Sequence, residues 1–442
     1  MLVAFCFGLL IITFHPKTKA NEQNFILGNR NLGFLDLFGS VITYMRTGSN
    51  LVFWFAFVAF MGFGSIWILI SFYTAFIIMT LLAGKAAKLS REQGYITFPD
   101  LIEERQGRLM SLLVSAFSFY VIVIMTVSQL FIAGSVVGEL ASIGNVSGII
   151  LCALIVGVYV SFGGFVSVVK TDTYQAAVIV LLALCAYLFL DWPTIKEFTT
   201  EVTKPNWAYV IGFGLIGFAV PASTDMWQRF FAAKEEKTLR FSIFTALIAD
   251  IFIVLGLIMF IKYVLGFAGA GGETDLFGGL FTTENEFPVA TALFGIFITS
   301  ALLSTIDNQI FNLASITSKN FLKIDAETQK ERFIKTLRIS TILSLSAFVV
   351  LSLTIHDFMQ WIIDTYAFVA VITPFIFYGV LTKAFSDKLL AIGVLVASGL
   401  YWFLHAQGYY SNMNWYALPF FTPLIFIACD HVIRMIADRK KS

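Results

Sequence analysis

Long uninterrupted apolar runs are the feature of this sequence that most restricts its fold. Thirteen of them follow one another through the 442 residues, and a helix needs about 20 apolar residues to cross a bilayer. Hydrophobic residues make up 58% of the chain and charged residues 13%, whereas an average soluble domain is about 25% charged. The sequence therefore predicts an all-α polytopic membrane protein and excludes a soluble enzyme.

The apolar runs set the expected spans, and the intervals between them are too short to hold a folded domain outside the membrane. The predicted spans cover residues 2–14, 33–62, 64–83, 109–138, 148–161, 173–191, 207–226, 241–265, 288–317, 339–355, 358–381, 389–405 and 414–433. Helix 0 is the first of these and helix 12 the last.

Basic residues are distributed unevenly between the two sides of the predicted bundle. Twenty-five of the 29 Lys and Arg residues fall in the intervals at 15–32, 84–108, 162–172, 227–240, 318–338, 382–388 and 434–442, which lie on one side. Because cytoplasmic loops are enriched in Lys and Arg, the alternation predicts a plasma (inner) membrane protein with its N-terminus outside and its C-terminus in the cytoplasm. A net charge of +1 gives no indication of a nucleic-acid partner.

Helix 8 carries a polar stripe at the centre of its apolar run. Ala301, Ser304 with Thr305, Asn308, Asn312 and Ser315 recur at helical spacing, and Asp307 lies beside them. A polar stripe facing lipid would be costly, so it must face protein or water. One interpretation is hydrogen bonding between helices; the other is an ion site, because hydroxyl and carbonyl oxygens suit a small hard cation.

Helices 1 and 6 contain residues that weaken a helix in mid-span. Thr47-Gly48-Ser49 interrupts helix 1, and several glycines with Pro221 interrupt helix 6. Interrupted helices in corresponding positions are the best sequence indicator of a transporter binding site, although kinks that serve only packing are the alternative.

Three carboxylates fall within or at the ends of spans and are functional candidates: Asp172, Asp250 and Asp364. Asp172 follows Gly163-Gly164 at the start of helix 5, so a solvated helix N-cap is an alternative role. The four histidines and four cysteines show no metal-ligand spacing or disulfide framework, and no phosphate-binding loop is present. Neither an enzyme nor an ATP-driven pump is indicated.

Several motifs, in order along nearly the whole chain, resemble those of the sodium:solute symporter family. They are Phe25-Ile26-Leu27-Gly28-Asn29-Arg30, the stretch from Tyr95 to Arg105, Gly163-Gly164 with Thr171-Asp172 and Gln175, the stretch from Asp225 to Lys234, and the stretch from Leu303 to Gln309.

The resemblance implies a LeuT-like fold with two inverted five-helix repeats. The expected divisions are 1–32 for the N-terminal helix and loop, 33–206 and 207–381 for the repeats, and 382–442 for two accessory helices and the tail. The resemblance further implies a sodium site between helices 1 and 8, formed by the Ser304 and Thr305 hydroxyls and by carbonyls of Ala301, Thr43 and Arg46. It places Asp172 on the inner sodium path, with Asp307 and Asn308 as partners in a second ion site.

Arg46 departs from the family pattern, because helix 1 is normally uncharged at this point. A guanidinium cannot be neutralised in a protein, so Arg46 must face an anion or water. Two partners are open: the carboxylate of an acidic solute, or an internal aspartate, for which Asp307 is the expected residue. Helix 2 carries Ser71-Phe72-Tyr73 where sugar-transporting members have a carboxylate, which disfavours a sugar.

The leading functional hypothesis is a symporter in which inward sodium flow drives a small organic solute by alternating access. The expected solute-binding residues are Arg46, Asn50, Trp54 and Gln129, sodium is the coupling ion, and the protein is expected to act as a monomer in the lipid bilayer. Two alternatives are a solute-sensing membrane domain working with a partner chain, and a proton-coupled or uncoupled transporter in which Arg46 replaces sodium.

Overall fold

The computed structural model of the chain describes residues 2–14, 22–48, 50, 54, 57–58, 61–190, 192, 198–199, 202, 207–268, 288–326, 328–354, 358–409 and 417–439. Its helices are α1 (Leu2–Phe14), α2 (Glu22–Leu27), α3 (Phe34–Met45), α5 (Ile66–Gln93), α6 (Phe98–Gln106), α7 (Arg108–Leu140), α8 (Asn145–Phe189), α10 (Trp207–Gly217), α11 (Asp225–Ala232), α12 (Glu236–Ala268), α14 (Pro288–Ile316), α15 (Lys330–Ser352), α16 (Phe358–Ala370), α17 (Thr373–Leu381), α18 (Asp387–Ala406) and α19 (Ala417–Arg439). Short turns are η1 (Gly28–Arg30), η2 (Gly62–Ser65), η3 (Val220–Ala222) and η4 (Thr317–Phe321).

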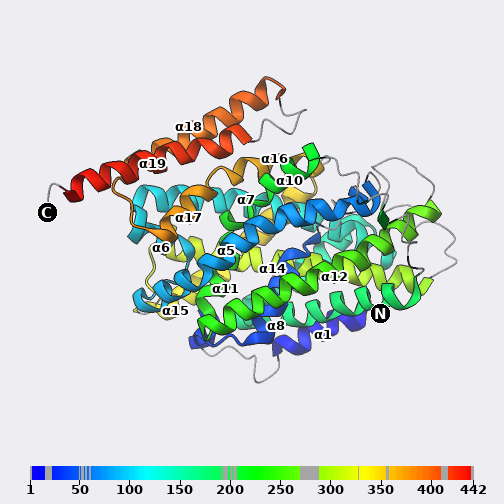
Figure 1. Cartoon of the computed structure of the whole chain (residues 1–442). Coiled ribbons are helices and arrows are strands. Elements are labelled where there is room, and N and C mark those ends of the chain that lie inside the picture. Colours follow the sequence, from blue (N-terminus) through cyan, green and yellow to red (C-terminus); the bar gives the residue numbers. More distant parts are fainter. Residues whose placement is uncertain are drawn as a thin grey trace.

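The helices form one bundle whose long members lie side by side (Figure 1). Within the described ranges, eight helical segments are long and apolar enough to cross a bilayer, and the bent pair α10–α11 makes a ninth. The helix α1 packs against α8 at one edge of the bundle, and the pair α18–α19 lies at the opposite edge. The N-terminal and the two C-terminal helices are therefore peripheral to the part of the chain between α3 and α17.

The 45-residue element α8 contains two spans rather than one. Tyr159 and Thr171 would lie about 18 Å apart on a straight helix, yet both hydroxyls donate to the same oxygen of Asp307, at 2.7 and 3.3 Å. The chain therefore folds back on itself at Gly164, whose φ of 60° and ψ of −154° interrupt the helix. A loop over 162–172 was expected, and this prediction is wrong, because a single glycine is enough to reverse the chain.

Helices 1 and 6 are broken where the sequence predicted. The helix α3 ends at Met45, and Arg46 leaves the helical conformation with φ −108° and ψ 52°. The helices α10 and α11 meet at an angle of 55° around the turn that holds Pro221. Helix 10 is also divided, into α16 and α17, and this break was not predicted from the sequence.

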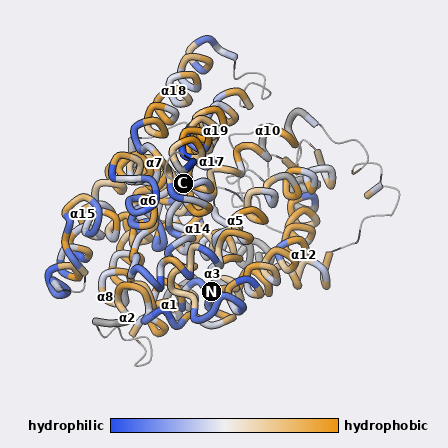
Figure 2. Tube along the Cα trace, turned by 60° about the vertical axis from the view of Figure 1, so that its left-hand side comes forward, coloured by the Kyte–Doolittle hydropathy of each residue, from blue (hydrophilic) through white to orange (hydrophobic). Residues whose placement is uncertain are grey.

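Apolar side chains cover both the inside and the outside of the bundle. In Figure 2 the hydrophobic colour runs along the helices, and hydrophilic stretches gather around α6, α15 and the start of α3. Large exposed hydrophobic residues include Leu188, Phe189 and Leu343, at 75%, 81% and 65%. A soluble monomer rarely exposes so much apolar surface, whereas a bilayer covers it.

Candidate solute and sodium sites

The break at the end of α3 places a buried arginine in the middle of the bundle. Arg46 Nε lies 2.7 Å from Asp250 Oδ1 on α12, and Nη2 donates to Asp250 Oδ2 at 2.8 Å. The Tyr73 hydroxyl of α5 also donates to Asp250 Oδ2. An internal aspartate was the favoured partner for Arg46, but the choice of Asp307 is wrong, because the side chain leaves the break toward α12 rather than toward α14.

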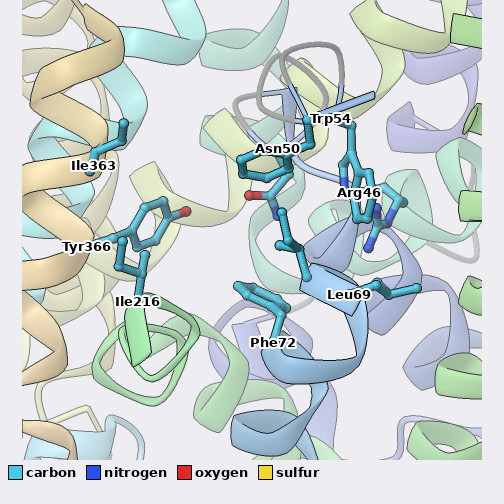
Figure 3. A pocket seen from close by; sticks show the side chains of 10 residues that line it. Arg46, Asn50, Trp54, Leu69, Phe72, Ile216, Ile363 and Tyr366 are labelled. Carbon is cyan, nitrogen blue, oxygen red and sulfur yellow. The ribbon is translucent and has the colours of Figure 1, made fainter. Parts of the chain in front are cut away.

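A first cavity, of about 530 Å³, opens beside this break. It is lined by Arg46, Asn50, Trp54, Phe57, Ile68, Leu69, Phe72, Ile216, Ile363 and Tyr366. Figure 3 shows Arg46 and Trp54 at one end of the cavity and Tyr366 and Ile363 at the other, with Asn50 between them.

Three of the four expected solute-binding residues line this cavity, and the fourth does not. Arg46, Asn50 and Trp54 belong to the wall. Gln129 of α7 is buried, and its amide oxygen would lie 2.5 Å from a Cβ added at Gly48. Gln129 is therefore a packing neighbour of the break in helix 1.

A second cavity, of about 460 Å³, lies next to the first and is more polar. Asn50, Phe72 and Tyr366 line both cavities and separate them. The other polar residues of its wall are Thr43, Tyr44, Thr47, Ser223, Asp225, Ser304, Thr305, Asn308 and Gln309. The Arg46 side chain is not part of this wall. The polar stripe of helix 8 (α14) therefore lines a cavity that the Arg46 guanidinium does not enter.

Two of the three expected sodium ligands of helix 8 (α14), Ser304 and Thr305, face this second cavity, whereas Ala301 does not line it. Ser304 Oγ donates to Asp172 Oδ1 at 2.7 Å, and Thr305 Oγ1 donates to the carbonyl of Ala301 at 2.9 Å. Both hydroxyls therefore keep oxygen lone pairs that a cation can use. Across the cavity, Thr43 belongs to the last turn of α3, where the carbonyls lose their helical partners.

Asp172 lies well inside a helix and is not an N-cap. It follows Gly164 by eight residues, and its side chain is fully buried. Its carboxylate accepts hydrogen bonds from Ser40 of α3, at 2.8 Å, and from Ser304 and Asn308 of α14, at 2.7 and 3.0 Å. The N-cap alternative is therefore wrong, because the helix resumes directly after the glycine.

Asp172 also pairs with an arginine that was noted in the sequence only as part of a motif. Arg229 of α11 places Nη2 3.0 Å from Asp172 Oδ2, and the two side chains are 3% and 0% exposed. The same nitrogen donates to the amide oxygen of Asn308. One buried carboxylate thus connects α8 with helices α3, α11 and α14.

Comparison with known proteins agrees with this geometry. The sequence model of the sodium:solute symporter family matches residues 25–204. The sodium/pantothenate symporter of Haemophilus influenzae is 26% identical over 432 residues, which cover 89% of this chain and 86% of that protein. Residues 25–204 of the chain are therefore similar to the sodium:solute symporter family.

Solved structures show that the chain has a LeuT-like fold. A Na+-coupled sialic acid symporter superposes with a TM-score of 0.73 at 15% identity, covering 96% of this chain and 95% of that one. A manganese transporter of Eremococcus coleocola superposes with a TM-score of 0.53 at 10% identity, covering 90% and 94%. These superpositions show that the chain shares the fold of these multi-pass membrane transporters.

Three further carboxylates of the chain line neither cavity. Asp307 accepts from Tyr159 and Thr171, and its Oδ1 has no hydrogen-bond partner among the described residues. Asp364 of α16 lies 3.4 Å from Nε2 of His405 on α18. Asp250, which the sequence indicated only as an intramembrane carboxylate, is the one that meets Arg46.

Proposed function

We propose that the protein is a sodium-coupled symporter that moves a small organic solute by alternating access. It binds the solute in the first cavity and sodium beside the second, on the two sides of the break in helix 1. The observation that supports this most directly is the shared wall of Asn50, Phe72 and Tyr366. A ligand in one cavity can change the affinity of the other cavity for its own ligand through that wall. This coupling free energy between the two binding events is what symport requires. Pantothenate, which the relative from Haemophilus influenzae carries, is the first solute to test.

The proposed sodium site is formed by oxygens of α3 and α14. The hydroxyls of Ser304 and Thr305 and the carbonyl of Ala301 supply one side, and the carbonyls of Thr43 and Arg46 supply the other. The Arg46 side chain pairs with Asp250 and leaves its backbone carbonyl at the break. This arrangement argues against the alternative in which the guanidinium takes the place of sodium.

The proposed inner path for sodium runs past Asp172, Asp307 and Asn308. In this conformation Arg229 binds both Asp172 and Asn308, so a cation can reach that pair only after the guanidinium has moved. Separation of α11 from α8 would then open the site toward the inner side, which is one half of alternating access.

The charge asymmetry of the sequence supports an orientation for this mechanism. We place the protein in the plasma (inner) membrane, with its N-terminus outside and its C-terminus in the cytoplasm, because Lys and Arg concentrate on one side. The segments 33–206 and 207–381 would be the two inverted repeats, and the functional unit would be a monomer.

The direct test is uptake into proteoliposomes under an imposed sodium gradient. Labelled pantothenate and a panel of other small organic solutes are compared in sodium and in potassium at equal ionic strength. We expect uptake above the external concentration only with the inward sodium gradient. Equal uptake of every solute in the two salts would contradict sodium-coupled symport.

A further inference from the structure

Arg46 satisfies only part of its hydrogen-bonding capacity within the protein. Nε and Nη2 face the two oxygens of Asp250. Nη1 is buried and has no hydrogen-bond partner among the residues that the structure describes. The Arg46 side chain is 2% exposed, so bulk water does not supply an acceptor. A buried charged donor without an acceptor is unfavourable, so Nη1 is available to an acceptor that enters the cavity.

The surroundings of Arg46 restrict what that acceptor can be. Arg46 lines the first cavity, whose wall is otherwise mostly aromatic and aliphatic. Figure 3 shows Asn50 and Tyr366 pointing toward the middle of this space, while Trp54 lies beside Arg46. The Arg46 Cζ atom is 5.7 Å from the centre of the Trp54 ring. A ligand with a polar acceptor at one end and an apolar body fits this distribution.

We propose that Arg46 Nη1 binds a carboxylate oxygen of the solute, so that the transported class is small organic acids with an apolar body. This inference rests on the proposed solute cavity. A hydrogen bond between two ionised groups is about twice as strong as one between neutral groups. Sodium bound beside the neighbouring cavity would offset the negative charge of the acid, which gives a physical reason for the two to bind together.

Asp250 and Tyr73 act in this proposal as positioning residues. Asp250 holds two nitrogens of the guanidinium, and the Tyr73 hydroxyl donates to the same carboxylate. Because the guanidinium is planar and rigid, fixing Nε and Nη2 also fixes the direction of Nη1. Neither residue needs to touch the solute to affect how well its carboxylate is recognised.

The test compares acids with neutral analogues of the same shape. Purified protein is titrated, in sodium and in potassium, with pantothenate and its alcohol pantothenol, and with a series of short-chain and branched acids and their primary amides. Binding is followed by the melting temperature and by calorimetry. We expect at least one acid to bind about 10- to 100-fold more tightly than its neutral analogue, the factor for one charged hydrogen bond.

Variants assign that preference to Arg46. Arg46→Gln should abolish the acid-to-neutral ratio while the rise in melting temperature caused by sodium alone persists. Arg46→Lys and Tyr73→Phe should lower the acid-to-neutral affinity ratio without abolishing it. These two variants test the assignment if Arg46→Gln does not fold. Arg338→Gln, which changes an arginine outside both cavities, is the matched control.

The outcomes separate this inference from the proposed function. Equal binding of acids and neutral analogues, binding of no acid, or an unchanged ratio in Arg46→Gln would overturn the carboxylate assignment. Sodium-driven uptake of a neutral solute would also overturn it while leaving the symport function intact. Absence of any sodium effect on melting temperature or uptake would instead contradict the proposed function itself.

Discussion

The carboxylate of Asp172 on α8 lies 3.0 Å from Nη2 of Arg229 on α11, with both side chains almost fully buried. Ser40, Ser304 and Asn308 donate to the same carboxylate. A buried charge with this many partners is tolerated because each oxygen is satisfied. The pair therefore closes the space between α8 and α11 in this conformation.

Removal of one partner of this pair should be strongly destabilising. Asp172→Asn removes the carboxylate that pairs with Arg229, and breaking a buried ion pair costs about 3–5 kcal/mol. The double variant Asp172→Asn/Arg229→Gln removes both charges and should recover much of the lost melting temperature. Asp172→Glu should keep part of the sodium-driven uptake. Equal melting temperatures for the single and double variants would count against the pair.

Loss of a sodium-ligand hydroxyl should weaken sodium activation. Ser304→Ala and Thr305→Ala should each cost about 1–3 kcal/mol, a roughly 5- to 150-fold higher sodium requirement. Solute affinity at saturating sodium should change much less. The matched control is Ser315→Ala on the same helix, since Ser315 is buried and donates to the carbonyl of Phe311. Unchanged sodium activation in both variants would remove these residues from the site.

Substitution of Gly164 should destabilise the reversal within α8. Its φ of 60° and ψ of −154° lie in a region that only glycine occupies readily. A Cβ at this position would also approach the Phe25 ring to 2.6 Å. Gly164→Ala should therefore lower stability by about 1–3 kcal/mol or more. Gly399→Ala, at a position of α18 with open space around it, should leave the melting temperature unchanged or raise it.

A cluster outside the spans should make stability depend on acid pH. The Tyr95 hydroxyl donates to Glu104, and Lys383 lies 3.4 Å from its carboxylate. These contacts lower the pKa of Glu104 below its ordinary value of 4.5. The stabilisation is fully present above that value and is lost as the pH falls through the lowered pKa.

The measurement is the melting-temperature difference between wild type and Glu104→Gln as a function of pH. We expect a constant small difference at neutral pH that disappears below the ordinary carboxyl range. Glu331→Gln, at an exposed position at the start of α15, is the control. A difference that grows as the pH falls would contradict the assignment.

The fold and the breaks in helices 1 and 6 were predictable because they depend on local sequence. Apolar runs set the spans, and Gly48 or Pro221 weakens a helix wherever the bundle places it. The helical stripe through Ser304 and Thr305 was predictable for the same reason. Each of these features follows from residues that are close together along the chain.

The partner of Arg46 could not be chosen in this way. The sequence supplies several intramembrane aspartates, and the choice between Asp250 and Asp307 depends on the direction in which the side chain leaves the break. The same limit applies to Arg229, whose pairing with Asp172 depends on the bend between α10 and α11. The sequence identifies the charges that need partners, and packing of the helices decides the pairs.

Two of the polar contacts that hold α3 in the bundle differ in strength. Near its end, Arg46 is held by a buried bidentate ion pair to α12, and six residues earlier Ser40 holds α8 by a single hydroxyl bond at 2.8 Å. Breaking a buried ion pair costs about 3–5 kcal/mol, whereas a hydrogen bond to a charged group contributes about 1.5–3 kcal/mol. The Ser40 contact is thus the easier of these two to release, and the Lys170–Asp36 ion pair at 2.5 Å is a further contact that must part before α3 can separate from α8.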